Sequence, residues 1–167
     1  MMNMTFNSQS GVSGILFICM GNICRSPLAE GIFQHKLSQR GVEHKYMVDS
    51  AGTGNWHAGN LADSRMRATA LSHGIDLKSR ARQVTKLDFK KFDMLLAMDR
   101  TNYLVLLDID KSETYSERVY MMRAFDPDIH QELDVPDPYF GGDNGFEEVY
   151  QMLERSCENL LNILESK

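Results

Sequence analysis

The sequence predicts an α/β protein in which helices cover both faces of a parallel β-sheet. Short apolar runs alternate along the chain with longer segments whose apolar residues recur every three or four positions. This alternation is typical of βαβ units, in which each crossover places a helix on one face of the sheet. The length of 167 residues suits one domain that is large enough to bury a core.

The predicted strands are apolar runs that end at polar or turn-forming residues. They cover residues 14–19, 46–51, 92–98 and 119–125. The first (GILFIC) and the third (FDMLLAM) are almost continuously apolar, which is typical of strands buried on both faces. Ligands bind such sheets at the carboxyl ends of the strands. We therefore expect Cys19, the last residue of the first strand, to lie near a binding site.

The predicted helices cover residues 27–40, 63–73 and 100–108, together with the last segment of the chain. Gly41 ends the first helix, and Gly74 follows the second. The last segment has the clearest helical pattern, because its apolar residues form one stripe. These residues are Phe146, Val149, Tyr150, Leu153, Cys157, Leu160, Leu161 and Leu164. Cys157 is therefore expected in the core.

Composition limits the classes of partner. The formal net charge of −5 argues against general binding to nucleic acid or to an anionic membrane, both of which need a basic surface. No apolar stretch approaches the roughly 20 residues that span a membrane. Three cysteines without a regular framework, and no recognisable targeting segment, predict a cytoplasmic protein. Residues 1–13 are predicted to be a disordered N-terminal extension and 14–167 a single domain.

The segment CMGNICRSP, residues 19–27, has the composition of an anion-binding loop between a strand and a helix. Gly21 and Asn22 are residue types that tolerate positive φ, so the backbone can curl and point successive N–H groups inward. Ser26 is the expected N-cap, with Pro27 at the first helical position, and the helix start adds its own N–H groups. The nucleotide-binding pattern GxxxxGK[ST] is absent. The loop is therefore predicted to hold a phosphoryl group.

Cys19 and Arg25 are the reactive candidates in this loop. The positive field of the loop would stabilise a Cys19 thiolate, and the planar guanidinium of Arg25 matches two phosphoryl oxygens. A thiolate inside a phosphate-binding loop predicts nucleophilic attack on phosphorus. A cysteine at a strand end can instead be a small buried hydrophobe. The order of buried strand, Gly-Asn turn, serine and proline favours catalysis.

Asp137, in the segment DVPDPYF (134–140), is a candidate general acid for the leaving group. It stands between two prolines in a short loop, which would hold it rigidly. On local sequence alone, a plain Asp-Pro turn explains this segment better.

Two motifs resemble those of the low-molecular-weight protein tyrosine phosphatases. ILFICMGNICRSPLAE resembles the family's signature loop, C-x-G-N-I-C-R-S-P, and VPDPY resembles its general-acid loop. VDSAGTGNW, HGIDL, ARQVT and FDMLLAMDRTN also fall at the family's usual places, so the resemblance covers residues 14 to 165. It implies a flavodoxin-like three-layer fold with four parallel strands, catalysis without a metal or cofactor, and a phosphocysteine intermediate.

Carried over residue by residue, the resemblance makes Cys19 the nucleophile, and makes Arg25 the group that binds the phosphoryl oxygens and stabilises the transition state. Ser26 would donate a hydrogen bond to the thiolate and help it leave in the second step. Asp137 would protonate the phenolic oxygen and then activate the hydrolytic water. The implied phosphate-binding loop comprises Cys19, Met20, Gly21, Asn22, Ile23, Cys24 and Arg25.

The resemblance also implies supporting residues around the loop. The strained backbone of Asn22 would be fixed by hydrogen bonds to Ser50 and His73. Ser50 can equally be an ordinary buried serine, and His73 also suits the C-terminal dipole of its helix. Asp99 and Arg82 match family positions and are interpreted as structural.

Trp56 and Tyr139 match the aromatic walls of the family's substrate cleft, whose depth favours phosphotyrosine over phosphoserine. Trp56 could instead be core, but its Gly-rich loop favours the cleft.

Cys24 can pack behind the loop, and the resemblance implies a second role as a disulfide partner that protects oxidised Cys19. Many animal members have two adjacent tyrosines where this chain has Tyr139-Phe140, so the second regulatory tyrosine is absent.

Other readings fit less well. Arsenate reductases that share the loop need further cysteines in mid-chain, and none lies between Cys24 and Cys157. Protein arginine phosphatases carry threonine where this loop has Ile23. A non-catalytic anion-binding module would need neither a thiol nor an acid, and a zinc site would lack a second ligand pair.

The expected partners are tyrosine-phosphorylated proteins and inorganic phosphate, as product and inhibitor. We expect a monomer or a weak dimer.

Overall fold

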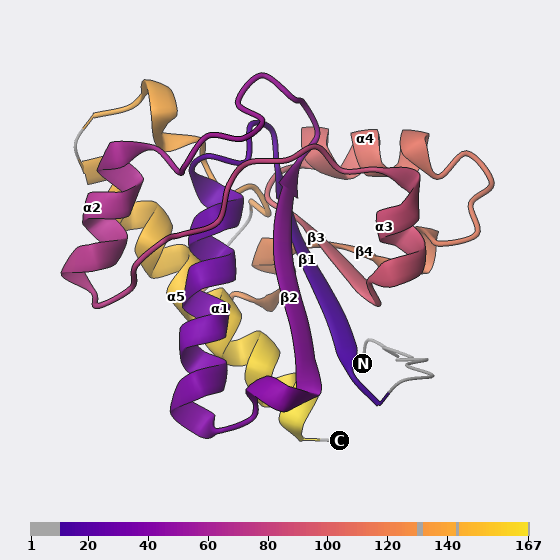
Figure 1. Cartoon of the computed structure of the whole chain (residues 1–167), viewed down its shortest axis with the longest axis horizontal. Helices are drawn as coiled ribbons and strands as arrows, with labels where there is room; N and C mark the ends of the chain where they lie inside the picture. Colours follow the sequence, from indigo (N-terminus) through magenta and orange to yellow (C-terminus); the bar gives the residue numbers. More distant parts are fainter. Residues whose placement is uncertain (1–10, 130–131, 143, 167) are drawn as a thin grey trace.

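A four-stranded, all-parallel sheet with the strand order β2-β1-β3-β4 forms the centre of the molecule. The computed structural model describes residues 11–129, 132–142 and 144–166 (Figure 1). Most of the predicted N-terminal extension, residues 1–10, lies outside the described residues. The strands are β1 (Ser13–Cys19), β2 (Tyr46–Gly52), β3 (Met94–Ala97) and β4 (Val119–Met121). The predicted α/β class and four parallel strands are confirmed.

Helices cover both faces of this sheet (Figure 1). They are α1 (Arg25–Arg40), α2 (Ser64–Ser72), α3 (Lys86–Lys91), α4 (Arg100–Ile109) and α5 (Asn144–Glu165). One apolar cluster packs β1 against α1, α2 and α5, and the other packs it against α3 and α4. Each face of the sheet therefore has its own core.

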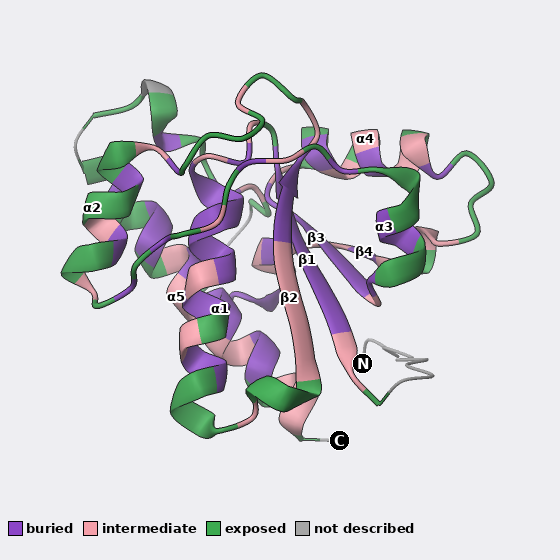
Figure 2. Ribbon diagram, viewed as in Figure 1, coloured by how far each residue is buried: buried purple, intermediate pink, exposed green. Residues whose placement is uncertain are grey.

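The alternation of side chains along β1 explains its continuous apolar run. Ile15 and Phe17 point into the larger cluster, whereas Leu16 and Ile18 point into the smaller one. All four side chains are fully buried. Figure 2 accordingly shows most of β1 in the colour of buried residues. A strand that is covered on both faces has no solvent-facing position for a polar residue.

The structure differs from the sequence prediction at two elements. The fourth strand ends at Met121, and residues 122–125 form a 3₁₀ turn instead of extending it. Met122 and Phe125, three positions apart, both enter the larger cluster, which an extended backbone would not allow. Helix α3 was not predicted, although Thr85 and Asp88 form a capping box at its start.

The carboxyl ends of the strands meet at one edge of the sheet, uppermost in Figure 1. The direction of the crossovers reverses between β1 and β3, which is the switch point where open α/β sheets bind ligands. Residues 20–24 leave β1 at this point, as expected. Among the described residues, no helix is long and apolar enough to cross a membrane.

Candidate active site

The loop between β1 and α1 curls at a single residue. Asn22 has a φ of 56°, in the left-handed region that Asn tolerates better than most residues. The curl expected at Gly21 and Asn22 therefore occurs at Asn22, and Gly21 does not adopt positive φ. Its role is steric, because a Cβ there would lie 3.1 Å from Cδ2 of the His57 ring.

The side chain of Asn22 is buried and holds the loop from behind. Its Nδ2 donates to Ser26 Oγ at 2.7 Å and to Ser50 Oγ at 3.0 Å. Its Oδ1 accepts from the backbone N–H of Arg82 at 3.1 Å. Ser50 in turn donates to Glu30 Oε2 at 2.6 Å. The left-handed backbone of Asn22 is therefore supported by partners from α1, β2 and the segment before α3.

The predicted contact between His73 and Asn22 is wrong. His73 is the C-cap of α2, and its Nε2 lies 2.9 Å from Glu147 Oε1. Its ring stacks on Tyr150 with centroids 3.6 Å apart. His73 therefore joins the end of α2 to α5, and the Arg82 N–H takes the place on Asn22 that the histidine was expected to fill.

Cys19 is almost fully buried at the end of β1, and its sulfur has two polar neighbours. The backbone N–H of Asn22 donates to Sγ at 3.3 Å, and Ser26 Oγ lies 3.0 Å from Sγ. Because Ser26 Oγ already accepts from Asn22 Nδ2, its own hydrogen can point at the sulfur, which lies closer than its other acceptor, the Ala51 carbonyl at 3.5 Å. Both groups can therefore donate a hydrogen bond to the Cys19 sulfur.

Ser26 is not the helix N-cap, which corrects the sequence prediction. Helix α1 begins at Arg25, and Cys24 occupies the N-cap position without a side-chain hydrogen bond. The hydroxyl of Ser26 is turned toward Cys19 and Asn22, so it is not available for capping.

Arg25 is buried beneath the pocket and is fixed by three acceptors. Its Nη1 donates to Asp99 Oδ2 at 2.7 Å and to the Val135 carbonyl at 2.9 Å. Its Nη2 lies 3.5 Å from Asp137 Oδ2. Burial disfavours the charged guanidinium, but Cys19 and the two carboxylates outweigh it and raise the pKa of Arg25 above its ordinary value.

Asp137 faces the loop across the pocket. It precedes a 3₁₀ turn, Pro138–Phe140, and its Oδ1 accepts from the backbone N–H of Tyr139 at 3.0 Å. Its other oxygen is the one near Arg25. A residue 112 positions away from Arg25 in the sequence thus meets it in space, and the side chain of Asp137 remains 30% exposed.

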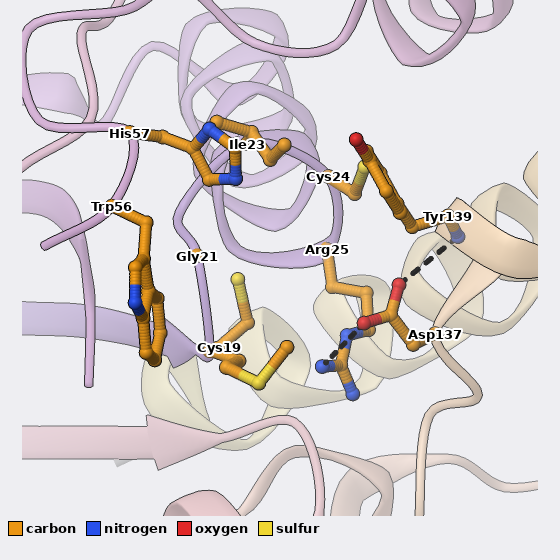
Figure 3. A pocket seen from close by; sticks show the side chains of 10 residues that line it. Cys19, Gly21, Ile23, Cys24, Arg25, Trp56, His57, Asp137 and Tyr139 are labelled. Atoms are coloured by element: carbon orange, nitrogen blue, oxygen red, sulfur yellow. Dashed lines mark hydrogen bonds and ion pairs between the residues drawn. The ribbon is translucent and has the colours of Figure 1, made fainter. Parts of the chain in front are cut away.

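The pocket itself has a volume of about 230 Å³. Its lining comprises Cys19, Met20, Gly21, Ile23, Cys24, Arg25, Trp56, His57, Asp137 and Tyr139. Figure 3 shows Trp56 and Tyr139 on opposite sides of the opening. Trp56 is 70% exposed, so it is not a core residue. A flat ring could enter between the two aromatic side chains and carry a phosphoryl group to the loop.

Cys24 lines the pocket but differs chemically from Cys19. Burial, with smaller contributions from Asp63, Cys19 and Asp137, raises the pKa of the Cys24 thiol to about 12. Cys24 therefore stays protonated at neutral pH. All three cysteines are free, and Cys157 is fully buried in the larger apolar cluster.

Three further residues at the site were not identified from the sequence. Glu30 lies on the buried side of α1, where burial raises its pKa despite hydrogen bonds from Ser50 and Ser79. Its spacing of four from Ser26 was the available signal. His57 follows Trp56 on the pocket rim, and Arg65 lies beside Tyr139.

Among the described residues, no cluster of His, Cys, Asp or Glu suits a metal ion.

Comparisons with known proteins show which family the chain resembles. Residues 14–167 match the family model described as low molecular weight phosphotyrosine protein phosphatase. A low molecular weight protein-tyrosine-phosphatase of Streptomyces coelicolor is 40% identical over 88% of this chain and 90% of its own length.

Solved structures extend the likeness to the fold. A protein tyrosine phosphatase from Entamoeba histolytica superposes with a TM-score of 0.88 and 44% identity, over 92% of this chain and 97% of that one. A drosophila arginine phosphatase superposes with a TM-score of 0.84 and 31% identity, over 90% and 96% of the two chains. The chain belongs to the low molecular weight phosphotyrosine protein phosphatase family.

Proposed function

We propose that this protein hydrolyses phosphotyrosine, and small aryl phosphates, through a phosphocysteine intermediate. One observation carries the proposal: the Cys19 sulfur lies at the base of the pocket, within reach of Ser26 and the Asn22 N–H, and opposite Arg25 and Asp137. Membership of the family supports it. Residues 14–167 would form the single catalytic domain.

In the first step, the phosphoryl group is bound by the N–H groups of the loop and by the guanidinium of Arg25. The Cys19 thiolate attacks phosphorus, so an S–P bond forms as the P–O bond to the phenol breaks. Asp137 gives its proton to the departing phenolic oxygen. The dianionic charge of the transition state is stabilised by Arg25, which Asp99 and Val135 hold in place.

In the second step, Asp137 is a carboxylate and takes a proton from a water molecule. That water attacks phosphorus, the S–P bond breaks, and the electron pair returns to Cys19. The hydroxyl of Ser26, 3.0 Å from the sulfur, stabilises the departing thiolate. The product, inorganic phosphate, occupies the same loop and is therefore expected to inhibit competitively.

The pocket walls support an aryl substrate. Trp56 and Tyr139 would sandwich the phenyl ring of phosphotyrosine, and the shorter phosphoserine would not bring its phosphorus to Cys19. Ile23 lines the pocket at the position where protein arginine phosphatases carry threonine. Its apolar side chain supports tyrosine over arginine as the phosphorylated residue. We further propose tyrosine-phosphorylated proteins as partners, a cytoplasmic location, and a monomer or weak dimer.

The direct test is hydrolysis of p-nitrophenyl phosphate at mildly acid pH with EDTA present, comparing the wild type with Cys19→Ser. We expect metal-independent turnover that the substitution abolishes. Matched peptides carrying phosphotyrosine, phosphoserine or phosphoarginine then rank the substrates, and phosphotyrosine is expected to have the highest kcat/KM. Inactivity of freshly reduced wild type would overturn the proposal, and a preference for phosphoarginine would overturn the substrate assignment.

A further inference from the structure

Arg65, in the first turn of α2, contacts the loop that carries Asp137. Its Nη2 donates to the backbone carbonyl of Tyr139 at 3.4 Å. Its guanidinium also lies over two aromatic rings, 5.4 Å from the centroid of Tyr139 and 4.7 Å from that of Phe146. These are cation–π distances, so one side chain holds both the backbone and the ring of Tyr139.

The same guanidinium is tied to the nucleophile loop. Arg65 Nε and Nη2 each lie 3.0 Å from a different carboxylate oxygen of Asp63. The backbone N–H of Asp63 donates to the carbonyl of Ile23 at 2.8 Å. Asp63 thus connects Arg65 to the middle of the loop between Cys19 and Arg25. A continuous series of contacts, Ile23–Asp63–Arg65–Tyr139, joins the two loops of the pocket.

Among the described residues, the Asp137 carboxylate contacts Arg25 Nη2 at 3.5 Å and the Tyr139 N–H at 3.0 Å, so its position depends on what holds its loop. On the N-terminal side, the loop is held at Val135, whose N–H donates to Met98 and whose carbonyl accepts from Arg25. On the C-terminal side, the Asp137 carboxylate is oriented by the N–H of Tyr139. Movement of Tyr139 would therefore move the carboxylate relative to the leaving-group oxygen.

We propose that Arg65 is a positioning residue that holds the general acid Asp137 over the pocket by tying Tyr139, through Asp63, to the nucleophile loop. The proposal rests on the catalytic roles proposed above. Arg65 does not line the pocket, so it acts through Tyr139 and not on the substrate.

A purely surface role is the competing explanation, because Arg65 is exposed and exposed ion pairs contribute little to stability. The two explanations differ in which substrates they affect. A misplaced acid slows the departure of a poor leaving group, which needs a proton, far more than that of a good one, which leaves as an anion. A general loosening of the fold slows both alike.

The test therefore compares kcat/KM for phenyl phosphate with kcat/KM for 2,4-dinitrophenyl phosphate, because this constant reports the steps through loss of the leaving group. In Arg65→Gln we expect about a tenfold loss for phenyl phosphate and less than about a twofold loss for the dinitrophenyl ester. Asp137→Asn serves as the reference for complete loss of the acid, and its ratio between the two substrates should exceed that of Arg65→Gln.

Two further variants make the comparison specific. Arg67→Gln removes the same charge from the same helix, and the exposed Arg67 side chain makes no hydrogen bond or ion pair to the described residues. We expect it to match the wild type. Arg65→Lys keeps the charge but loses the planar fork, so a smaller shift in the same direction is expected. It also carries the test if Arg65→Gln does not fold, as judged by its thermal unfolding.

Equal losses for both substrates, or no loss in either Arg65 variant, would overturn the positioning role while leaving the proposed function intact. A wild type inactive on both substrates would instead overturn the proposed function. The two failures are therefore distinguishable.

Discussion

The guanidinium of Arg25 donates to the carboxylate of Asp99 at 2.7 Å, and this contact fixes the phosphate-binding group of the proposed active site. The two residues follow different strands, β1 and β3, and meet where the crossover direction reverses. Asp99 is also the N-cap of α4, where its Oδ1 accepts from the Asn102 N–H at 2.7 Å. The carboxylate of Asp99 therefore has two roles. It caps α4, which is the structural role expected from the sequence, and it orients the guanidinium of Arg25.

Asp99→Asn separates these two functions of Asp99. Asparagine is an equally good N-cap, so α4 should remain stable, whereas the charged hydrogen bond to Arg25 is lost. We expect kcat/KM for p-nitrophenyl phosphate to fall about tenfold or more, with little change in thermal unfolding. The control is Asp108→Asn, an exposed position on the same helix, which should leave the activity unchanged. Full activity in Asp99→Asn would show that Arg25 does not need this partner.

Substitution of Asn22 tests the role of the left-handed residue. Both Asn22→Ala and Asn22→Gly lose the hydrogen bonds to Ser26 and Ser50, so both should lower kcat. Alanine also has the steric cost of positive φ, so the glycine variant should be more stable by about 1 kcal/mol. Urea unfolding measures the difference. An alanine variant as stable as the glycine variant would contradict the account of the loop backbone.

The three cysteines should differ sharply in reactivity. The pKa of Cys24 is raised to about 12, and burial raises that of Cys157, so both are thiols at pH 7. Iodoacetate should therefore modify Cys19 alone at neutral pH, and inorganic phosphate should protect it. Peptide mapping at increasing pH should find Cys24 modified only as the solution becomes strongly alkaline. Equal labelling of Cys19 and Cys24 at pH 7 would contradict this assignment.

The lowered pKa of Asp126 predicts how the stability of the protein depends on pH. Its buried carboxylate is disfavoured by burial, but hydrogen bonds from Arg155, at 3.0 and 3.1 Å, and from the Asp128 N–H outweigh this and lower its pKa. A lowered folded-state pKa contributes stability above the unfolded pKa, and this contribution is lost as the pH falls through the folded pKa.

Asp126→Asn should therefore destabilise the protein by about 2 kcal/mol at pH 7. The difference from the wild type should shrink below the ordinary pKa of 3.8. Urea unfolding of both proteins at several pH values measures it. Asp108→Asn, at an exposed position on α4, is the control. A difference that stays constant down to the lowest pH at which both proteins fold would contradict the assignment.

Much of the fold follows from local patterns in the sequence. The continuous apolar run of β1 and the stripe of α5 are strong signals, since burial on two faces or on one decides which positions are apolar. Helix α3 has only six residues, too few for a periodic pattern, so its capping box was the only available signal. The shortened β4 depends on where Met122 and Phe125 find space, which tertiary packing decides.

The site was predictable where it is contiguous in sequence. The loop from Cys19 to Arg25 could be interpreted from its residue types alone, whereas Asp137 needed the resemblance to a known family. Ser26 was misassigned because a serine before a proline is a normal N-cap, and only the fold shows that its hydroxyl contacts Cys19. The contact between Arg65 and Tyr139 joins segments far apart in the chain, and no local pattern predicts it.

The central claim is that Cys19 becomes covalently phosphorylated during turnover. The most direct measurement uses Asp137→Asn, which should still accept the phosphoryl group from p-nitrophenyl phosphate but lacks the base that activates water. Acid quenching during turnover, followed by digestion and mass spectrometry, should find one phosphoryl group on the peptide that contains Cys19, and none in Cys19→Ser. Turnover with no phosphorylated Cys19, or with the group on another residue, would contradict the account.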